Sequence, residues 1–361
     1  MNQSLQLGFF IQPVHPPTRA YLDVLTEDRE AVVLADELGF REAFVGEHLA
    51  DAAETITSSL AFISSLADRC PRIVFGTGVL PLPNYHPAMV AAQVAMVDHF
   101  VRGRLLLGVG PGVPSDAEVL DAVGPDRRLQ LAEAIEQILA IWTGEPPYRL
   151  QGEFYRTTTE RSWTREIGVG CFVKPFQRPH PPIVITSIRP DSEAPYTAGR
   201  RGWSGISATY VGEYVVRAHL EAYRAGRAAA GLSDETTGWR VARSIFVADD
   251  ESTAADYALP ASGAHGFYFR VMQAKLARFG ALGLMGDSPN SGDLDLEHTL
   301  ARLVIAGTPD QVADRIVAFR ERVGPFGTLL YTGHDWVNPV LARRSMELMV
   351  REVWPRVLDR S

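Results

Sequence analysis

Cysteine is scarce in this 361-residue chain, and long hydrophobic runs are missing. The two cysteines, Cys70 and Cys171, lie far apart and lack the partners of a zinc site, which is typical of thiols in a reducing cytosol. No apolar run approaches the roughly 18 to 20 residues that a membrane span needs. The first residues also lack the basic segment and long apolar stretch of a secretory signal. We therefore expect a cytoplasmic protein with no membrane association.

An excess of positive charge is missing too. The formal net charge of −8 provides no electrostatic footprint for nucleic acid. The chain has neither the H-E-x-x-H motif of zinc enzymes nor the G-x-S-x-G motif of serine hydrolases. Its acid–histidine pairs, Glu47-His48 and His334-Asp335, lack the spacing for shared ligation of an ion. We therefore predict no metal site and favour small-molecule chemistry.

Strand-like and helix-like patterns alternate along the whole chain. Eight short apolar segments read as strands: 5–11, 43–45, 73–80, 105–109, 183–185, 205–207, 241–247 and 328–332. Most of them precede a helical pattern, and these helices are expected at 21–38, 58–67, 87–100, 127–142, 192–199, 212–230, 309–322 and 340–358. Apolar strands that alternate with helices indicate a parallel sheet covered by helices.

The length favours a closed barrel over an open sheet. At about 45 residues per strand–helix unit, the chain suits a barrel with insertions. The prediction is an α/β protein with one domain over residues 1–361, a (β/α)8 TIM barrel. Insertions are expected at about 144–182 and 250–300. Long insertions of this kind are typical of lids or binding segments.

The active site of a parallel barrel lies at the C-terminal ends of its strands. The residues that follow the predicted strands include 12–15, 47–48, 77–78, 84–86, 110–112, 186–187, Ser207 and 334–335. Histidines and hydroxyl groups gather there, and lysine is nearly absent. This composition favours hydrogen bonding around an organic cofactor over Schiff-base chemistry.

Several of these residues also have a purely structural explanation. His48 could bind a loop carbonyl, His86 could begin a helix, and His180 lies in a stiff proline connector. Glu47 and His48 are neighbours, so on an extended segment they point in opposite directions. The glycines at 108, 110 and 112 have G-x-G-x-G spacing, which differs from the dinucleotide fingerprint but suits a backbone close to a flat ring.

In their order and spacing, eight segments resemble the luciferase-like flavin monooxygenase family over essentially the whole chain. They are GFFIQPVHP, ELGFREAFVGEHL, FGTGVLPLPNYHPAMVA, RGRLLLGVGPG, RRLQLAEAIEQILAIWTGE, FQRPHPPIVITS, VIAGTPDQVADRIVAF and LLYTGHDW. The branches that look nearest are the limonene-type monooxygenases and the type II Baeyer–Villiger diketocamphane monooxygenases.

The resemblance implies a catalytic histidine and a flavin-binding wall. His48 matches the family's active-site histidine near the reactive edge of the flavin. Thr77, Gly78 and Val79 match the segment behind the isoalloxazine, and the resemblance implies a non-prolyl cis peptide at Gly78–Val79. Gly110 stands where bacterial luciferase has a reactive cysteine.

The same resemblance implies a phosphate site. Arg128 matches an arginine that meets the flavin phosphate, a task that suits a guanidinium. The structural alternative is a solvated arginine on the helix surface. Thr186, Ser187 and Ser192 match a segment that binds the same phosphate. Pro111 replaces a second arginine of luciferase, so Arg128 is expected to carry more of the charge.

The implied chemistry is two-component monooxygenation. Reduced FMN, delivered by a separate NAD(P)H:flavin reductase, would react with O2 to a C4a-peroxide that the two insertions shelter from water. His48 would act as acid or base or hydrogen-bond the peroxide. A hydrophobic substrate would lie in a pocket shaped by His15, Tyr85, Phe267, Tyr268 and Phe269. A homodimer through helices of the first half is expected from the family.

Two other functions remain open at this stage. The same fold accommodates oxidoreductases that transfer hydride with the deazaflavin F420, and also non-catalytic flavin-binding subunits. Retention of His48 and Arg128 argues against the second. A two-domain nucleotide-dependent dehydrogenase is disfavoured, because no acidic residue follows a proper glycine fingerprint. The identity of the substrate cannot be read from the sequence.

Overall fold

A closed ring of eight parallel strands forms the centre of the computed structural model, which describes residues 5–12, 14–122, 124, 126–291, 294–334 and 336–360. In order around the ring, the strands are β1 (Gln6–Ile11), β2 (Glu42–Val45), β3 (Val74–Thr77), β5 (Leu105–Gly110), β8 (Ile183–Ser187), β9 (Ser204–Ser207), β10 (Trp239–Val247) and β12 (Thr328–Gly333). β12 pairs with both β10 and β1, which closes the ring. The predicted barrel and all eight of its strands are confirmed.

Two shorter strands extend this sheet without belonging to the ring. β4 (Leu80–Pro81) pairs with β5, and β11 (Val304–Gly307) pairs with the C-terminal part of β10. The sequence analysis did not predict β11. Its four residues directly follow a helix with no intervening loop, so the pattern offers no turn signal between the two elements.

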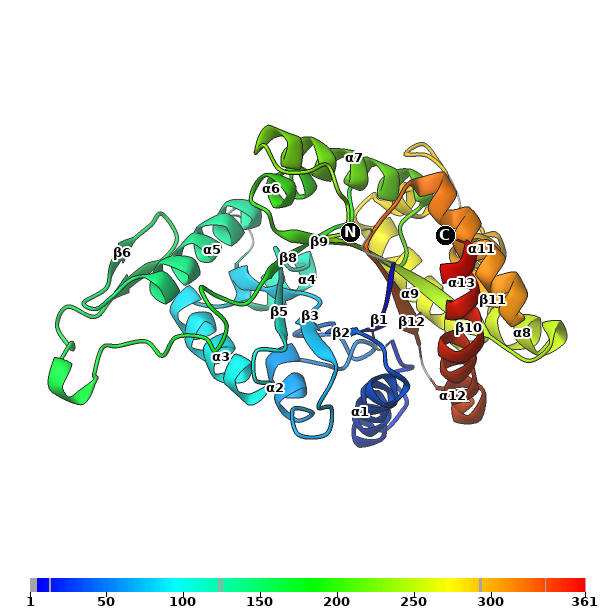
Figure 1. Ribbon diagram of the computed structural model, residues 1–361, viewed down its shortest axis with the longest axis horizontal. Coiled ribbons are helices and arrows are strands. Elements are labelled where there is room, and N and C mark those ends of the chain that lie inside the picture. The colour runs from blue at the N-terminus through cyan, green and yellow to red at the C-terminus, as the bar shows by residue number, and fades with distance from the viewer. Residues whose placement is uncertain are drawn as a thin grey trace.

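Helices surround the ring of strands (Figure 1). They are α1 (Tyr21–Leu38), α2 (Ser59–Ser64), α3 (Pro87–Phe100), α4 (Pro114–Val119), α5 (Arg127–Thr143), α6 (Ala194–Arg200), α7 (Glu213–Ala229), α8 (Glu251–Ala258), α9 (Ala264–Arg278), α10 (Leu296–Leu303), α11 (Pro309–Val323), α12 (Pro339–Leu348) and α13 (Trp354–Arg360). Their starts follow local chemistry. Asp126 caps α5, and Thr308 with Gln311 forms a capping box at α11, which satisfies backbone N–H groups that a helix start leaves free.

The barrel interior is filled by side chains that alternate along the strands with those facing the helices. Its apolar part consists of Phe10, Phe44, Leu106, Val184, Ile206, Ala242 and Leu330. At the N-terminal ends of the strands, Arg240 of β10 donates from Nε and Nη2 to the carboxylate of Glu42 of β2, at 2.5 and 2.9 Å. This two-point ion pair lies at the N-terminal end of the barrel, and sites of parallel barrels lie at the opposite, open end.

The two insertions occupy different places. Residues 144–182 include an antiparallel hairpin, β6 (Arg149–Gln151) with β7 (Arg156–Thr158), which projects from one side of the molecule in Figure 1. The return of this insertion runs along α3 and α5, where Gln177 contacts Asp98 and the Lys174 ammonium donates to the carbonyl of Ile141. Residues 250–300 instead form α8, α9 and α10 beside β10 and β11. Much of 144–182 therefore lies along α3 and α5, and the expectation that both insertions shelter the site stays a prediction.

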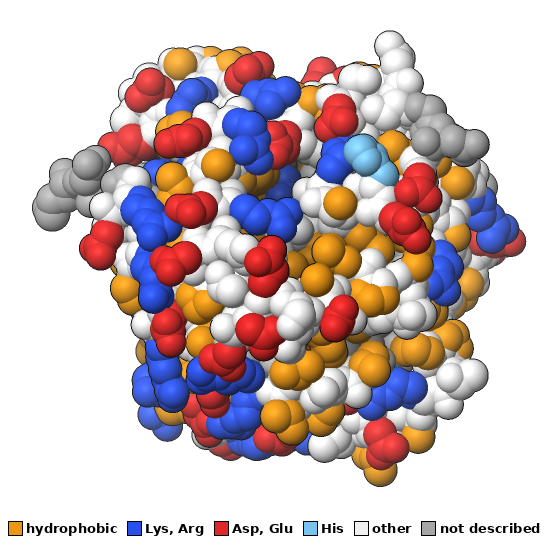
Figure 2. Space-filling view, turned by 90° about the vertical axis from the view of Figure 1, so that its right-hand side faces the viewer, with side chains coloured by type: hydrophobic (Ala, Val, Ile, Leu, Met, Phe, Trp, Pro, Cys, Tyr) orange, Lys and Arg blue, Asp and Glu red, His pale blue; other side chains and the backbone are white. Residues whose placement is uncertain are grey.

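The surface carries mixed charges on the face shown in Figure 2, where acidic and basic side chains intermingle around hydrophobic patches. Elements near the C-terminus are joined by surface ion pairs, such as those of Arg360 of α13 with Asp310 and Asp314 of α11. Among the described residues, no helix combines the length and the hydrophobicity that crossing a membrane would need.

Candidate active site

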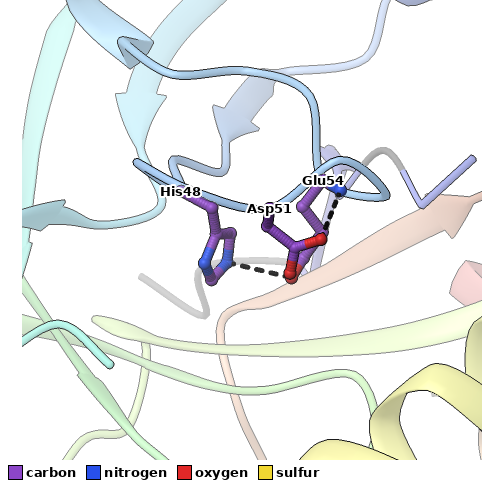
Figure 3. A group of neighbouring side chains, drawn as sticks. All are labelled: His48, Asp51 and Glu54. Carbon is purple, nitrogen blue, oxygen red and sulfur yellow. Dashed lines mark hydrogen bonds and ion pairs between the residues drawn. The ribbon is translucent and has the colours of Figure 1, made fainter. Parts of the chain in front are cut away.

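The loop between β2 and α2 lies at the open end of the barrel and bends back on itself. Asp51 accepts hydrogen bonds from the backbone N–H groups of Ala53 and Glu54, at 2.9 and 3.2 Å, which is a local turn that aspartate favours. The backbone N–H of His48 donates to the carbonyl of Ile56 across the base of the loop. These bonds bring Glu54 next to His48 (Figure 3).

His48 and Glu54 form an ion pair. The Nε2 atom of His48 lies 3.2 Å from Oε2 of Glu54, which is almost fully buried, and one fifth of the His48 side chain is exposed. Burial works to lower the pKa of His48, but the charge and hydrogen bond of Glu54 outweigh it, so this pKa is raised. Burial works to raise the pKa of Glu54, and its cationic neighbours reverse this too, so its pKa lies far below the usual range. Glu54 is therefore an acceptor at neutral pH, and His48 donates from Nε2.

Lys275 of α9 completes this group from a distant part of the chain. Its ammonium contacts the carboxylates of both Asp51 and Glu54. Oxygen and nitrogen atoms of His48, Asp51 and Glu54 all lie within 4.8 Å of one another, a geometry that could hold a metal ion. Because the Lys275 ammonium already contacts both carboxylates, we regard this arrangement as a salt-bridge network. The prediction of no metal site stays a prediction.

Glu47 points away from His48, as its neighbouring position in sequence predicts. One carboxylate oxygen accepts from the backbone and the hydroxyl of Ser59, at 2.8 and 2.6 Å. The other accepts from the hydroxyl of Tyr85 at 2.5 Å. Burial raises the pKa of Glu47 despite these bonds. The hydrogen bond to Glu47 fixes the position of the Tyr85 hydroxyl close to the C-terminal ends of the strands. Tyr85 is one of the predicted substrate contacts.

Glycines bring the backbones of β3 and β5 together next to the His48 loop. The peptide bond between Gly78 and Val79 is cis, which confirms the prediction made from the family resemblance. A Cβ atom at Gly108 would lie 1.8 Å from the carbonyl oxygen of Thr77, and one at Gly110 would lie 2.7 Å from the Val79 side chain. Thr77 also donates from Oγ1 to the carbonyl of Gly108, at 2.6 Å. We call the surface formed by Gly78, Gly108 and Gly110 the glycine wall. The backbone N–H of Gly78 donates to the carbonyl of Val45 in β2, so the glycine wall directly adjoins the His48 loop.

The predicted phosphate residues lie at the end of β8, just after it and in the first turn of α5. The Thr186 hydroxyl is buried with no hydrogen-bond partner among the described residues. Ser187 is buried, and the Ser192 hydroxyl accepts from the backbone of Ala194. Arg128 is largely exposed at the start of α5, and it lies near enough to help lower the pKa of Asp191, although Arg189 has the larger effect.

Arg127 is a residue that the sequence analysis missed. It donates from Nε to the carbonyl of Pro111, at 2.8 Å, and contacts Asn84, so it lies across the end of β5. Its Nη1 atom and the hydroxyl of Tyr155 are buried without a partner among the described residues. Arg127 and Arg128 differ by one residue on a helix, so only the orientation of the α5 start decides which of them faces the strand ends.

The remaining predicted substrate contacts lie in two other places. His15 is buried, and its Nε2 lies 3.0 Å from the carboxylate of Asp28 in α1. Phe269 is fully buried against Tyr268, and Phe267 is partly buried at the edge of the core. Tyr268 reaches the site, because its hydroxyl donates to Gln12, which in turn donates to Glu54 at 3.4 Å.

The other histidines have structural roles, as several of the alternatives proposed. His86 caps α3 by accepting from the backbone of Ala88, and His180 stacks on Trp142. His219 of α7 joins Ser207 to the carbonyl of Arg189. Asp335 lies outside the described residues.

The structure fits a flavin. The glycines let the backbones of β3 and β5 pack closely into one flat surface, and Thr186 Oγ1 and Arg127 Nη1 are buried polar atoms without a partner among the described residues. An α/β barrel with a carboxylate-bound histidine beside such a wall defines a cofactor-dependent barrel enzyme. Residues 5–324 match the model of the luciferase-like monooxygenase family, and the chain belongs to that family. Several relatives of the chain are named as monooxygenases.

Relatives and solved structures agree with this assignment. The chain is 30% identical to 4-hydroxyprotoasukamycin monooxygenase of Streptomyces nodosus subsp. asukaensis, covering 98% of this chain and 92% of that one. It is 28% identical to limonene 1,2-monooxygenase of Rhodococcus erythropolis, covering 97% and 86%. The oxygenating constituent of 3,6-diketocamphane monooxygenase from Pseudomonas putida, solved with FMN, shares the fold with a TM-score of 0.87 and 24% identity, covering 98% and 99%.

Relatives with another cofactor are also present. The chain is 26% identical to F420-dependent glucose-6-phosphate dehydrogenase of Nocardia farcinica, covering 98% of each chain.

Proposed function

We propose that this enzyme is the oxygenating component of a two-component system, which takes reduced FMN from a separate reductase and transfers one oxygen atom from O2 to a hydrophobic substrate. The observation that carries the proposal is the position of the His48–Glu54 pair beside the glycine wall at Gly78–Val79. A titrating imidazole next to a flat-ring site is suited to proton transfer during oxygenation. When bound, the flavin supplies the activation of oxygen.

The chain's own residues orient the ligands and move protons. His48 donates from Nε2 to Glu54, so its Nδ1 is the nitrogen that can accept a proton from a ligand or, when protonated, return it. Thr77, Gly78, Val79 and Gly110 would support the ring. Thr186, Ser187 and Ser192 would bind the phosphate together with Arg128. The α9 segment would shelter the site from water on the side where the Tyr268 hydroxyl donates to Gln12.

The test uses purified protein and photoreduced FMN mixed rapidly with O2. We expect tight binding of reduced FMN, slowed release of H2O2 compared with free FMN, and an ¹⁸O atom from ¹⁸O2 in the product of a terpenoid or cyclic ketone. His48→Asn should lose product formation while it still binds FMN. Unchanged H2O2 release together with no FMN binding would overturn the proposal.

Arg128 can be tested separately. Replacement of Arg128 with alanine should weaken FMN binding about tenfold, as expected for one solvated charge–phosphate contact worth about 1.4 kcal/mol. Arg127→Met is the matched variant. If Arg127→Met weakens binding and Arg128→Ala does not, the phosphate role belongs to Arg127.

An F420-dependent hydride transfer is the second candidate, favoured by the full-length similarity to F420-dependent relatives. It predicts tight F420 binding and anaerobic reduction of F420 by an alcohol substrate. The oxygenase proposal predicts no turnover without O2, so the two are separated by one anaerobic assay.

We also propose a homodimer. The outer face of α3 presents Met89, Met96 and Phe100, each more than half exposed. These residues lie on one stripe of the helix, and an apolar stripe on the surface is suited to a partner helix. Sedimentation equilibrium should give a dimer for the wild type and a monomer for Met96→Glu.

A further inference from the structure

We propose that Lys275 is a positioning residue of the active site, which acts from α9 through Glu54 to hold His48 with its Nδ1 atom free for the bound ligand. The inference rests on the proposed role of His48 and adds a partner from the 250–300 insertion. The carboxylate of Glu54 is shared between the Lys275 ammonium and the His48 ring, so both contacts meet on the same oxygen, Oε2.

Both oxygen atoms of the Glu54 carboxylate are contacted by other side chains of the site. Asp51 binds the backbone of Glu54 and also contacts Lys275, so the turn and the lysine hold the same carboxylate. The other oxygen of Glu54 accepts from Gln12, whose carbonyl is held by Tyr268. Tyr268 and Lys275 lie seven residues apart on α9, which places them on the same face of that helix. One face of α9 therefore contacts the Glu54 carboxylate both directly and through Gln12.

Lysine is rare in this chain, so the identity of residue 275 can be compared with only one other lysine. Among 35 basic residues of the lysine and arginine type, only Lys174 and Lys275 are lysine. Both ammonium groups contact more than one acceptor, which suits a compact charge with three donors. A planar guanidinium would need a wider, forked arrangement of acceptors.

Three charged side chains act on the His48 ring, and they do not all act in the same direction. Glu54 and, more weakly, Asp116 favour the protonated ring, and Lys275 opposes it. Glu47 lies on the other side of the backbone, where it is bound by Ser59 and Tyr85. The lysine therefore has two effects: it keeps Glu54 ionised, and it moderates the affinity of His48 for its proton.

The experiment is a titration of ¹⁵N-histidine-labelled protein by NMR, without flavin. In the wild type at high pH, the ring shifts should show His48 protonated at Nε2 and bare at Nδ1. Lys275→Met should raise the titration midpoint of His48, because it removes a positive charge. Glu54→Gln should lower it, because burial remains and the carboxylate charge is lost. Lys275→Arg, which keeps the charge, should stay near the wild type.

Lys174→Met is the matched control, since it removes the only other enclosed ammonium, far from His48. It should leave the His48 midpoint unchanged. An unchanged midpoint in Lys275→Met, a fall in that variant, or a proton on Nδ1 in the wild type would each overturn the inference. If Lys275→Met does not fold, a second sample labelled with ¹⁵N-lysine serves instead. The Lys275 ¹⁵Nζ signal of the wild type should shift in Glu54→Gln, and an unmoved signal would refute the contact.

The outcomes separate this inference from the proposed function. The titration needs no flavin, so a shifted midpoint in a protein that fails to bind FMN would refute the oxygenase and keep the positioning role. If the protein transfers oxygen but the NMR titration midpoint of His48 is unchanged in Lys275→Met, only the positioning role is refuted.

Discussion

Two groups of histidines lie at the same end of the barrel and behave in opposite ways. His48 is paired with Glu54 and partly exposed, and its pKa is raised. His265 of α9 and His334 after β12 are buried, 4.9 Å apart in an edge-to-face contact, with Tyr268 stacked on His334. Burial lowers the pKa of His265 to about 4 and that of His334 well below its ordinary value.

The two groups differ in whether a carboxylate contacts the imidazole. Burial disfavours the imidazolium in both groups, but only His48 has an ionised neighbour that reverses the effect. His265 and His334 line a cavity of about 20 Å³, which is too small for an organic substrate. His48 is therefore suited to proton transfer. His265 and His334 are suited to forming a neutral aromatic wall.

The largest expected effect is on catalysis. His48→Ala should lower kcat/KM for oxygen transfer by about 10² to 10⁴, the range for loss of a general acid or base. His265→Phe should leave kcat/KM within about threefold, because a neutral buried ring can be replaced by another aromatic ring. Steady-state assays of product formation at several pH values measure both. A large loss of kcat/KM in His265→Phe would contradict the inferred difference between His48 and the buried histidine pair.

The next effect is on stability in acid. His265 and His219 have pKa values of about 4 in the folded protein, below the value of about 6.5 in the unfolded chain. Below pH 6.5 the unfolded chain therefore binds more protons, so the free energy of unfolding falls as the pH drops from about 6.5 to about 4. Each buried histidine should contribute a slope of about 1.4 kcal/mol per pH unit in that window.

Urea unfolding at a series of pH values tests this slope. His265→Phe should reduce it by the share of one histidine, and Glu54→Gln should not reduce it between pH 6.5 and 4. Equal slopes in the wild type and His265→Phe would mean that the buried ring takes up its proton in the folded state.

The smallest effect concerns the hydroxyl that links the two groups. Tyr268→Phe keeps the ring stacked on His334 and removes the hydrogen bond to Gln12, so it should cost about 1 kcal/mol of unfolding free energy. Tyr223→Phe, which loses a bond to the Trp203 carbonyl, is the matched control. Only Tyr268→Phe should also move the NMR midpoint of His48, and a shift in both variants would indicate a general loosening of the barrel.

Much of the architecture follows from local sequence. The predicted helices 21–38 and 87–100 match α1 and α3 at both ends, because Gly39 ends the first and Pro87 begins the second. The hairpin of β6 and β7 was missed because each strand has three residues, mostly exposed, with no apolar alternation. The His48 loop and the glycine wall were predicted from the family resemblance, and the cis bond at Gly78–Val79 is confirmed.

The sequence by itself determined the strand–helix alternation, the helix starts and the placement of His48 after a strand, since these depend on periodicity and on neighbours within a few residues. Tertiary structure alone decided that Arg127 covers the end of β5 and that Lys275 meets Glu54. The first depends on the rotation of α5, and the second joins segments more than 200 residues apart. Pairs of this kind carry no local pattern, because their energy depends on burial and distance that exist only once the barrel has closed.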